Sequence, residues 1–244
     1  MSISRPKFLG IIPARGGSKG IKNKNIRNFA GRPLIYHTIK EAQKSKYLDR
    51  IIVSTESQKI AAVAKKYGAE VPFLRPRELA QDRSKVLDAV EHLLNKLKEE
   101  ENYSPQFVVL LQPTSPLRTV TEIDGIIQLF LKRKADSAIT MCATEPRVFA
   151  KDKKDGLRLV SSKDFLKSTN RQDFMPTFKE DGSMVYVNRV KTLLAKRNFL
   201  GGKLVGYAIP RWRAVDLDEP QDFVVGELIY KNFRKIDTKI KNFK

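Results

Sequence analysis

The stretch that decides the fold is FLGIIPARGGSKGIKNKN, which spans residues 8–25. Its apolar start, residues 8–12, predicts a buried strand, and residues 13–25 predict a loop with three glycines, a serine, an arginine and three lysines. Glycines let backbone amides approach an anion closely and the cations neutralise it, so the loop is typical of a polyphosphate site. The glycine order fits neither G-x-G-x-x-G nor G-x-x-x-x-G-K-[ST]. A surface turn with scattered lysines is the alternative, but ligands of open α/β sheets bind where a strand ends and a helix begins.

Short apolar segments alternate with amphipathic segments through the first 142 residues. The predicted strands are 8–12, 51–54, 71–74, 107–111 and 137–142, and apolar stripes at helical spacing cover 34–42, 60–67, 86–97 and 123–131. Such alternation predicts an α/β fold with three layers, in which helices cover both faces of a mostly parallel sheet.

The alternation stops after Cys142. Residues 143–182 are rich in charged and turn-forming residues, and Asp155-Gly156 between two short β-like pieces indicates a hairpin. Strands are predicted again at 183–187 and 204–210. We therefore expect a single domain, residues 1–244, with 143–182 as an inserted arm. A long ordered loop is the alternative for that segment.

The composition, 41% apolar and 30% charged, is that of a globular protein with a substantial core. No apolar stretch is long enough for a membrane span or a secretory signal, so we expect no membrane partner. The single cysteine, Cys142, lies in an apolar segment, which favours a buried inert thiol over a nucleophile. His37 and His92 have no Cys or His neighbours, which argues against a zinc site. A reducing cytoplasm fits these features.

The formal net charge of +20 is unusual. It could indicate a nucleic-acid binder, but the lysines and arginines are dispersed and no aromatic recognition module accompanies them, so we expect no nucleic-acid partner. The densest late cluster, residues 231–244, is interpreted as a solvated helix end and tail. Anionic substrates would account for part of the surplus, and the remainder has no explanation in the sequence.

Six segments carry a resemblance to one family. They are residues 15–25, GRPL at 31–34, IIVST at 51–55, LRPRELA at 74–80, LQPTSPLRT at 111–119 and DLD at 216–218. In this order they resemble the CMP-sialic acid synthetase (acylneuraminate cytidylyltransferase) family, which includes the CMP-legionaminic and CMP-pseudaminic acid synthetases, and the likeness spans about residues 7–232.

The resemblance implies a Rossmann-like nucleotidyltransferase sheet and an enzyme that activates a nonulosonic acid with CTP, giving the CMP-sugar and pyrophosphate. The same chemistry on legionaminic, pseudaminic or 3-deoxy-octulosonic acid is the alternative. A non-catalytic polyanion-binding protein, which would use the +20 charge without catalysis, is a remote one. The expected partners are CTP, an acidic nine-carbon sugar and a second copy of the chain, because the family's inserted arm dimerises and reaches the neighbouring subunit's site.

The resemblance also assigns roles to individual residues. Arg15 and Lys24 match the triphosphate-binding arginine and lysine and are the expected catalytic residues, since they would neutralise the triphosphate and the departing pyrophosphate. The implied nucleotide-binding set is Pro13, Ala14, Arg15, Gly16, Gly17, Ser18, Lys24, Asn25 and Arg75. The implied sugar-binding set is Gln112, Thr114, Ser115 and Arg171. A salt bridge is an equally good interpretation of Arg171, and Lys19 and Lys22 are interpreted as rim charges.

Asp216 and Asp218 alternate on a predicted final strand before Pro220, which puts both carboxylates on one face. Alone, the pair could be a solvated edge or a helix cap. Its match to the family's metal-binding Asp-x-Asp favours Mg²⁺, which would hold phosphate oxygens. Magnesium is the expected cofactor.

Two positions depart from the family's pattern. Glu56 stands where the family usually has aspartate after Val-Ser-Thr, and we expect the longer acid to serve at the strand end. After Asp82 the family usually has several small hydroxyl residues that help hold the cytidine, whereas this chain keeps only Ser84. Backbone groups are the expected substitute there.

Overall fold

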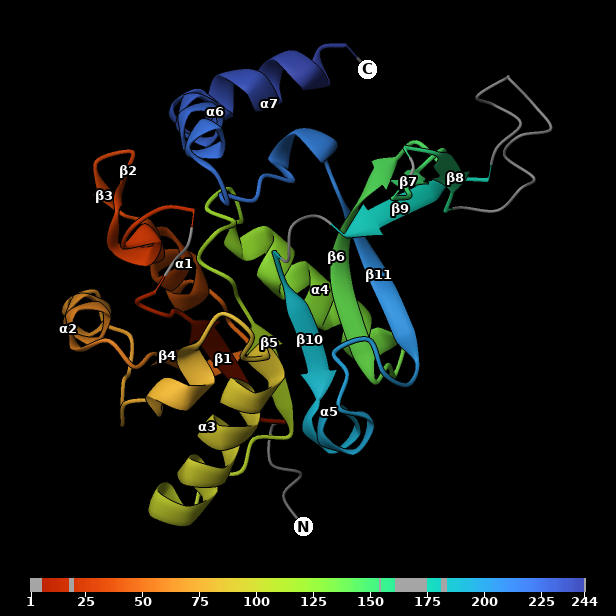
Figure 1. The fold of residues 1–244 in the computed structure, drawn as a ribbon. Helices are drawn as coiled ribbons and strands as arrows, with labels where there is room; N and C mark the ends of the chain where they lie inside the picture. Colours follow the sequence, from red (N-terminus) through yellow and green to blue (C-terminus); the bar gives the residue numbers. More distant parts are fainter. Residues whose placement is uncertain (1–5, 18–19, 154, 161–174, 181–183, 244) are drawn as a thin grey trace.

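The computed structural model describes residues 6–17, 20–153, 155–160, 175–180 and 184–243. A seven-stranded sheet with the order β11-β6-β10-β5-β1-β4, and β9 beside β6, runs through the molecule (Figure 1). Its strands are β1 (Phe8–Pro13), β4 (Leu48–Ser54), β5 (Phe107–Leu110), β6 (Ser137–Thr144), β9 (Thr177–Glu180), β10 (Tyr186–Arg189) and β11 (Leu204–Ile209).

The sheet is mostly parallel, as predicted. β1 pairs in parallel with β4 and β5, and Ile11 lies opposite Ile52 on one side and Leu110 on the other. β11 pairs in parallel with β6, whereas β10 lies between β5 and β6 and is antiparallel to both. The carboxyl ends of β1, β4 and β5 therefore meet at one edge of the sheet.

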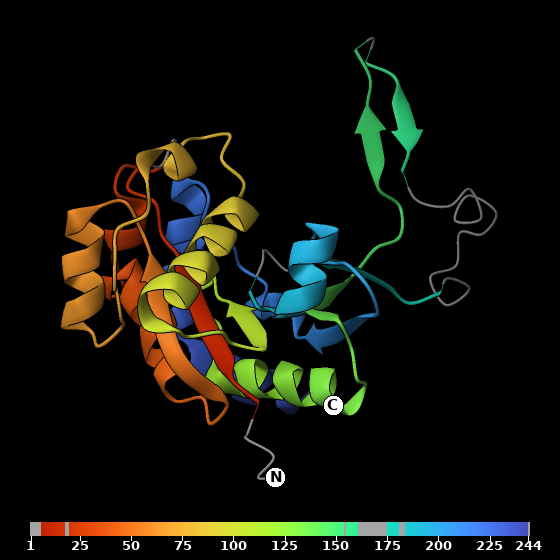
Figure 2. The ribbon, with the colours of Figure 1, turned by 90° about the horizontal axis from the view of Figure 1, so that it is seen from below.

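Helices cover both faces of this sheet (Figures 1 and 2). They are α1 (Leu34–Gln43), α2 (Gln58–Lys66), α3 (Val86–Glu101), α4 (Val120–Lys132), α5 (Val190–Lys196), α6 (Pro220–Lys231) and α7 (Phe233–Lys241). Side chains alternate along β1, so Phe8 and Ile12 pack in the core with α1, α2 and α4, while Leu9 and Ile11 pack in the core with α3 and α5. The predicted three layers are confirmed.

The strand predicted at 71–74 is wrong. The segment forms no strand, and pairing beside β4 is limited to a single bridge between Ile52 and Glu70. Pro72 lacks the N–H that a ladder needs, and the chain leaves the sheet edge there. It rejoins the strand end at Arg75, whose backbone N–H donates to Thr55 O at 2.9 Å.

The hairpin predicted at Asp155-Gly156 is present. β7 (Phe149–Lys151) and β8 (Leu157–Leu159) pair antiparallel, and Asp155 takes the left-handed conformation at φ 62°. Figure 2 shows the hairpin projecting from the body, and β9 then returns to pair with β6. Residues 161–174 of the expected arm lie outside the described residues.

A small separate core joins the glycine loop to α6. Around it lie the 3₁₀ turn η1 (Lys24–Ile26) and the short strands β2 (Asn28–Phe29) and β3 (Arg32–Pro33). Its buried side chains are Ile21, Phe29, Leu34, Leu217 and Phe223. Of the helices described, none has the length and apolar character needed to cross a bilayer.

Candidate active site

A cleft of about 560 Å³ lies where the carboxyl ends of β1 and β5 meet the glycine loop and the segment before α6. Nine of the residues singled out in the sequence line it. They are Pro13, Arg15, Lys24, Asn25, Arg75, Gln112, Thr114, Asp216 and Asp218. The cleft thus brings together residues from four separate stretches of the chain, and Asp82 and Ser84 add to its wall.

The remaining predicted residues are placed differently. Ala14 and Ser115 are fully buried, and the backbone N–H of Ala14 donates to Ser54 O at 3.0 Å. Gly16 and Gly17 belong to the loop beside the cleft. The predicted residues Ser18 and Arg171 lie outside the described residues.

Two hydrogen bonds fix the glycine loop to its surroundings. The amide of Gly16 donates to Glu56 Oε1 at 2.6 Å, and Asn25 Nδ2 donates to Arg15 O at 2.9 Å. A Cβ atom on Gly20 would lie 2.7 Å from the carbonyl oxygen of Asp218, so glycine there allows the loop to touch the segment that carries the carboxylate pair.

Glu56 bridges the loop to Arg75. The Arg75 side chain is buried, and its Nη2 donates to Glu56 Oε2 at 2.9 Å while the other oxygen of Glu56 accepts from Gly16. One carboxylate therefore fixes both an amide of the glycine loop and a predicted nucleotide contact. From the sequence, Glu56 is only a departure from a motif. Its position directly after a strand end is the feature that could have indicated this bridging role.

Both predicted catalytic cations form ion pairs with carboxylates of the cleft wall. Arg15 Nη1 lies 2.9 Å from Asp82 Oδ1, and Lys24 Nζ lies 2.8 Å from Asp218 Oδ1. The side chain of Lys24 is 15% exposed, whereas that of Asp218 is 68% exposed. The lysine is thus packed in the wall and presents its charge to the open side of the cleft.

The carboxylate pair does not lie on a strand, contrary to expectation. Residues 214–219 form an extended connection whose link to the sheet side is the bond from Leu217 N to Thr114 O, 2.9 Å. Thr114 itself lies in the turn after β5, so no strand is available there to form a ladder. Leu217 is fully buried in the small core, and both Asp216 and Asp218 line the cleft, so the period of two places the carboxylates as expected.

Asp216 is the more buried carboxylate of the pair. Burial raises its pKa to about 6, a hydrogen bond from Thr114 opposes this, and the charge of Asp218 adds to the rise. Its Oδ1 is buried and has no hydrogen-bond partner among the described residues. A buried anionic oxygen in this condition favours a bound cation.

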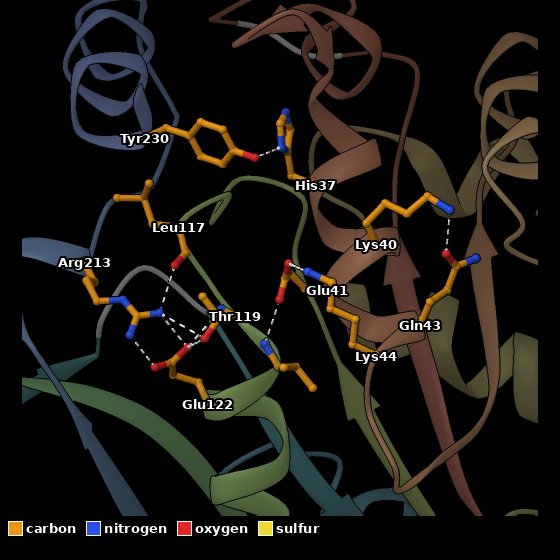
Figure 3. Close-up of polar contacts among 11 residues, drawn as sticks. His37, Lys40, Glu41, Gln43, Lys44, Leu117, Thr119, Glu122, Arg213 and Tyr230 are labelled. Atoms are coloured by element: carbon orange, nitrogen blue, oxygen red, sulfur yellow. Dashed lines mark hydrogen bonds and ion pairs between the residues drawn. The ribbon is translucent and has the colours of Figure 1, made fainter. Parts of the chain in front are cut away.

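A buried ion pair holds the chain just before Asp216. Arg213 lies in the 3₁₀ turn η5 (Arg211–Arg213). Its Nη1 donates to Glu122 Oε1 and its Nη2 to Glu122 Oε2, both at 2.6 Å (Figure 3). Nη2 also donates to Leu117 O at 3.1 Å. After the pair, Asp218 N donates to Asp222 Oδ2 at 3.0 Å at the start of α6. The carboxylate segment is therefore fixed on both sides.

A second buried arginine supports the other wall of the cleft. Arg118 is 2% exposed, and its Nη2 donates to Gln112 O at 3.0 Å and to Thr38 Oγ1 at 2.6 Å, while Nη1 donates to Met184 O. Arg118 thus fixes the backbone that carries Gln112. Neither Arg118 nor Arg213 was singled out by its own chemistry, because a buried arginine cannot be recognised from charge alone.

The sequence signature of the cytidylyltransferase family matches residues 9–235. The chain belongs to the cytidylyltransferase family. This confirms the resemblance carried by the six segments.

The chain is similar to several named proteins of this family. It is 33% identical over 223 residues to the CMP-N,N'-diacetyllegionaminic acid synthase of Legionella pneumophila, covering 91% of this chain and 95% of that one. It is 30% identical over 236 residues to the N-acylneuraminate cytidylyltransferase of Escherichia coli O18:K1:H7, covering 96% of this chain and 55% of that one. It is 30% identical over 230 residues to the pseudaminic acid cytidylyltransferase of Campylobacter jejuni, covering 92% and 97%. The chain therefore spans about half the length of the Escherichia coli relative and nearly all of the other two.

Solved structures share the fold of the chain. The CMP:2-keto-3-deoxy-manno-octonic acid synthetase, solved with CTP, superposes with a TM-score of 0.69 at 15% identity, covering 93% of this chain and 99% of that one. The 4-diphosphocytidyl-2C-methyl-D-erythritol synthase from Anaerococcus prevotii gives a TM-score of 0.63 at 14% identity, covering 93% and 100%. The predicted Rossmann-like nucleotidyltransferase fold is confirmed.

Proposed function

We propose that the chain is a magnesium-dependent cytidylyltransferase that joins CMP from CTP to a nonulosonic acid and releases pyrophosphate. The observation that carries the proposal is that one cleft holds Arg15, Lys24, the Asp216–Asp218 pair and Gln112. The relatives named for acylneuraminic, legionaminic and pseudaminic acids support this class of sugar.

The chemistry requires positioning and charge neutralisation more than a protein nucleophile. A hydroxyl oxygen of the sugar attacks the α-phosphorus of CTP and an O–P bond forms. The bond from the α-phosphorus to the bridging oxygen breaks, so that pyrophosphate leaves, and the hydroxyl proton passes to solvent water. Arg15 and Lys24 neutralise the triphosphate by exchanging Asp82 and Asp218 for phosphate oxygens. Glu56 keeps the glycine loop and Arg75 in place for the nucleotide.

Asp216 and Asp218 are the residues that would hold magnesium. The fit rests on the buried oxygen of Asp216 that lacks a hydrogen-bond partner and on the raised pKa of that carboxyl. Among the residues the structure describes, no cluster of three or more His, Cys, Asp or Glu side chains forms, so two carboxylates would share the ion with substrate oxygens and water, as Mg²⁺ prefers. When bound, the ion would neutralise charge on the phosphate oxygens.

Gln112 and Thr114 line the cleft at the end of β5, and we assign the sugar to this side of it. The choice among sialic, legionaminic, pseudaminic and octulosonic acids depends on groups at the sugar's periphery. A substrate panel distinguishes among these acids. A reducing cytoplasm remains the proposed location, because the single cysteine is buried as a free thiol.

We propose a homodimer as the working form. The described parts of the arm carry large apolar side chains that are 44–77% exposed, and the β7–β8 hairpin projects from the body. These side chains are Val148, Phe149, Leu157, Val160, Met175 and Phe178. A second copy would cover them. Light scattering at micromolar concentration should give the mass of a dimer, and a monomer would contradict this.

The function is tested by pyrophosphate release from CTP with a panel of sialic, legionaminic, pseudaminic and octulosonic acids, each with Mg²⁺ or with EDTA. We expect release with at least one acid, dependent on both the acid and the metal. Release that ignores the acid, or that persists unchanged in EDTA, would reject the proposal. UTP in place of CTP serves as the nucleotide control.

A further inference from the structure

The outward face of α6 is apolar. Val224, Val225 and Leu228 are 64%, 52% and 59% exposed, and their spacing places them on one side of the helix. The buried residues of α6, Phe223 and Gly226, lie on its other side. Single exposed apolar residues are ordinary, but a contiguous apolar face on the outer helix of a domain marks a contact surface.

Helix α7 extends this face and surrounds it with cations. It is attached at its start, where the Phe233 ring lies 4.9 Å from the Trp212 ring. Farther along, Ile236 faces Leu228 of α6 across an apolar groove of about 330 Å³ that is flanked by Lys235 and Lys239. We call the surface formed by Val224, Val225, Leu228, Ile236 and Phe243, with Lys235 and Lys239, the α6–α7 surface; Phe243 at its end is 91% exposed.

The charge of this region is strongly positive. Residues 231–244 contain six lysines and arginines against one acid, a net charge of +5. Lys231 and Lys241 are paired with Glu227 and Asp237 at 2.9 and 2.7 Å. Within the described part of the chain, no ion pair engages the cations of the α6–α7 surface itself, so their charge is available to an anionic partner.

Two kinds of partner fit this combination poorly. Nucleic acid would match the lysines, but phosphates would leave the exposed valines and leucine uncovered. A second copy docking through the same face would set lysines against lysines, because a two-fold interface brings each patch onto itself. The partner must be both anionic and able to accept aliphatic side chains.

We propose that the α6–α7 surface docks the protein on an anionic lipid bilayer. Val224, Leu228 and Phe243 enter the headgroup region, and the lysines lie at the lipid phosphates. Figure 1 shows α6 and α7 at one end of the molecule, with the C-terminus at the far end of α7. The contact is peripheral and gives part of the +20 charge a role. It differs from the expectation from sequence, which was that the protein has no membrane partner.

The surface lies beside the candidate cleft without forming its wall. Gly20 lines both the cleft and a neighbouring cavity bordered by Val224 and Leu228. None of the side chains that define the α6–α7 surface lines the cleft. Changes to this surface should therefore alter membrane binding and leave turnover in solution unaffected, which separates this inference from the proposed function.

The test is sedimentation of the full chain with vesicles of phosphatidylcholine alone or mixed with phosphatidylglycerol, at low and physiological salt. Lys235→Glu/Lys239→Glu reverses two charges on the surface, and Lys65→Glu/Lys66→Glu makes the same change at exposed positions at the end of α2, away from the surface. Val224→Ser/Leu228→Ser removes apolar area, and Leu200→Ser, at a 40% exposed leucine, is its control.

We expect binding to the phosphatidylglycerol vesicles, weakened about tenfold or more by Lys235→Glu/Lys239→Glu and clearly less by the α2 variant. Val224→Ser/Leu228→Ser should also weaken it, and Leu200→Ser should not. Absence of binding at low salt, or equal loss in both charge-reversal variants, would overturn the proposal. So would tighter binding to duplex DNA than to vesicles, or a change of oligomeric mass in Val224→Ser/Leu228→Ser without a change in vesicle binding.

Discussion

Lys24 Nζ lies 2.8 Å from Asp218 Oδ1, a contact between residues 194 positions apart in the chain. The pair joins the glycine loop after β1 to the segment before α6. Its carboxylate is well exposed, so the pair adds little to stability. It holds a cation suited to phosphate and a carboxylate suited to a metal ion side by side in the cleft, as the proposed function requires.

Lys24→Ala tests this assignment. Removing the cation that neutralises the departing pyrophosphate should lower turnover by about a hundredfold or more. Lys22→Ala is the matched control, since Lys22 is exposed and lies outside the cleft, and it should keep nearly normal turnover. Pyrophosphate release under saturating CTP measures both, and equal activities in the two variants would remove Lys24 from the mechanism.

Asp216→Asn tests the carboxylate pair. We expect loss of magnesium-dependent synthesis with an unchanged circular dichroism spectrum. In EDTA at neutral pH the variant should be at least as resistant to urea as the native chain, because it replaces a buried carboxylate oxygen that has no hydrogen-bond partner in the described structure. A variant that is both active and less stable would make Asp216 a structural residue.

Arg213→Ala tests the ion pair that holds the chain before Asp216. The side chains of Arg213 and Glu122 are 11% and 5% exposed, so removing one partner should lower the free energy of unfolding by about 3–5 kcal/mol. Arg197→Ala breaks the exposed pair with Glu91 and should cost less than about 1 kcal/mol. Urea unfolding measures both, and similar losses would mean that the Arg213 pair is not buried in solution.

His37 provides the pH dependence. Its Nε2 lies 2.9 Å from Phe29 O and its Nδ1 lies 3.1 Å from the Tyr230 hydroxyl (Figure 3), and burial lowers its pKa. As the pH falls through ~6.5, His37 therefore takes up a proton in the unfolded chain but stays neutral in the folded chain. The stability due to neutral His37 is present above that pH and is lost as the pH falls below it.

His37→Gln is the corresponding variant. It should be less stable than the native chain at pH 7, and the difference in the free energy of unfolding should shrink as the pH is lowered to about 5. Urea titrations at several pH values measure this difference. A difference that stays constant across the range would show that His37 does not titrate with unfolding.

Much of the fold was predictable because its determinants are local. The apolar run before the glycine loop and the four helical stripes each specify an element by their own periodicity, and the alternation of elements specifies the sheet. The strand predicted at 71–74 does not form, because Val71 and Phe73 pack in the core while Pro72 prevents pairing. The strand predicted at Asp216–Asp218 does not form because the backbone bond of this segment, from Leu217 N to Thr114 O, is to a turn.

The sequence predicts the site residues that lie in recognisable motifs. It does not predict those whose role depends on tertiary packing. Arg15, Lys24 and Asp218 lie in recognisable patterns and meet in the cleft. Glu56 and Arg213 act through partners 40 and 91 positions away, and nothing in their neighbourhoods along the chain indicates those partners. Long-range polar contacts of this kind depend on the tertiary structure.

The most direct test of the central claim follows the α-phosphate of CTP. The protein is incubated with CTP labelled at the α-phosphorus, Mg²⁺ and the acid that performs best in the substrate panel. We predict that the label appears in a CMP-sugar, with one unlabelled pyrophosphate released for each product formed and with no transfer in Asp216→Asn. Label that remains in CTP with every acid, or that appears in free CMP without a sugar adduct, would contradict the account.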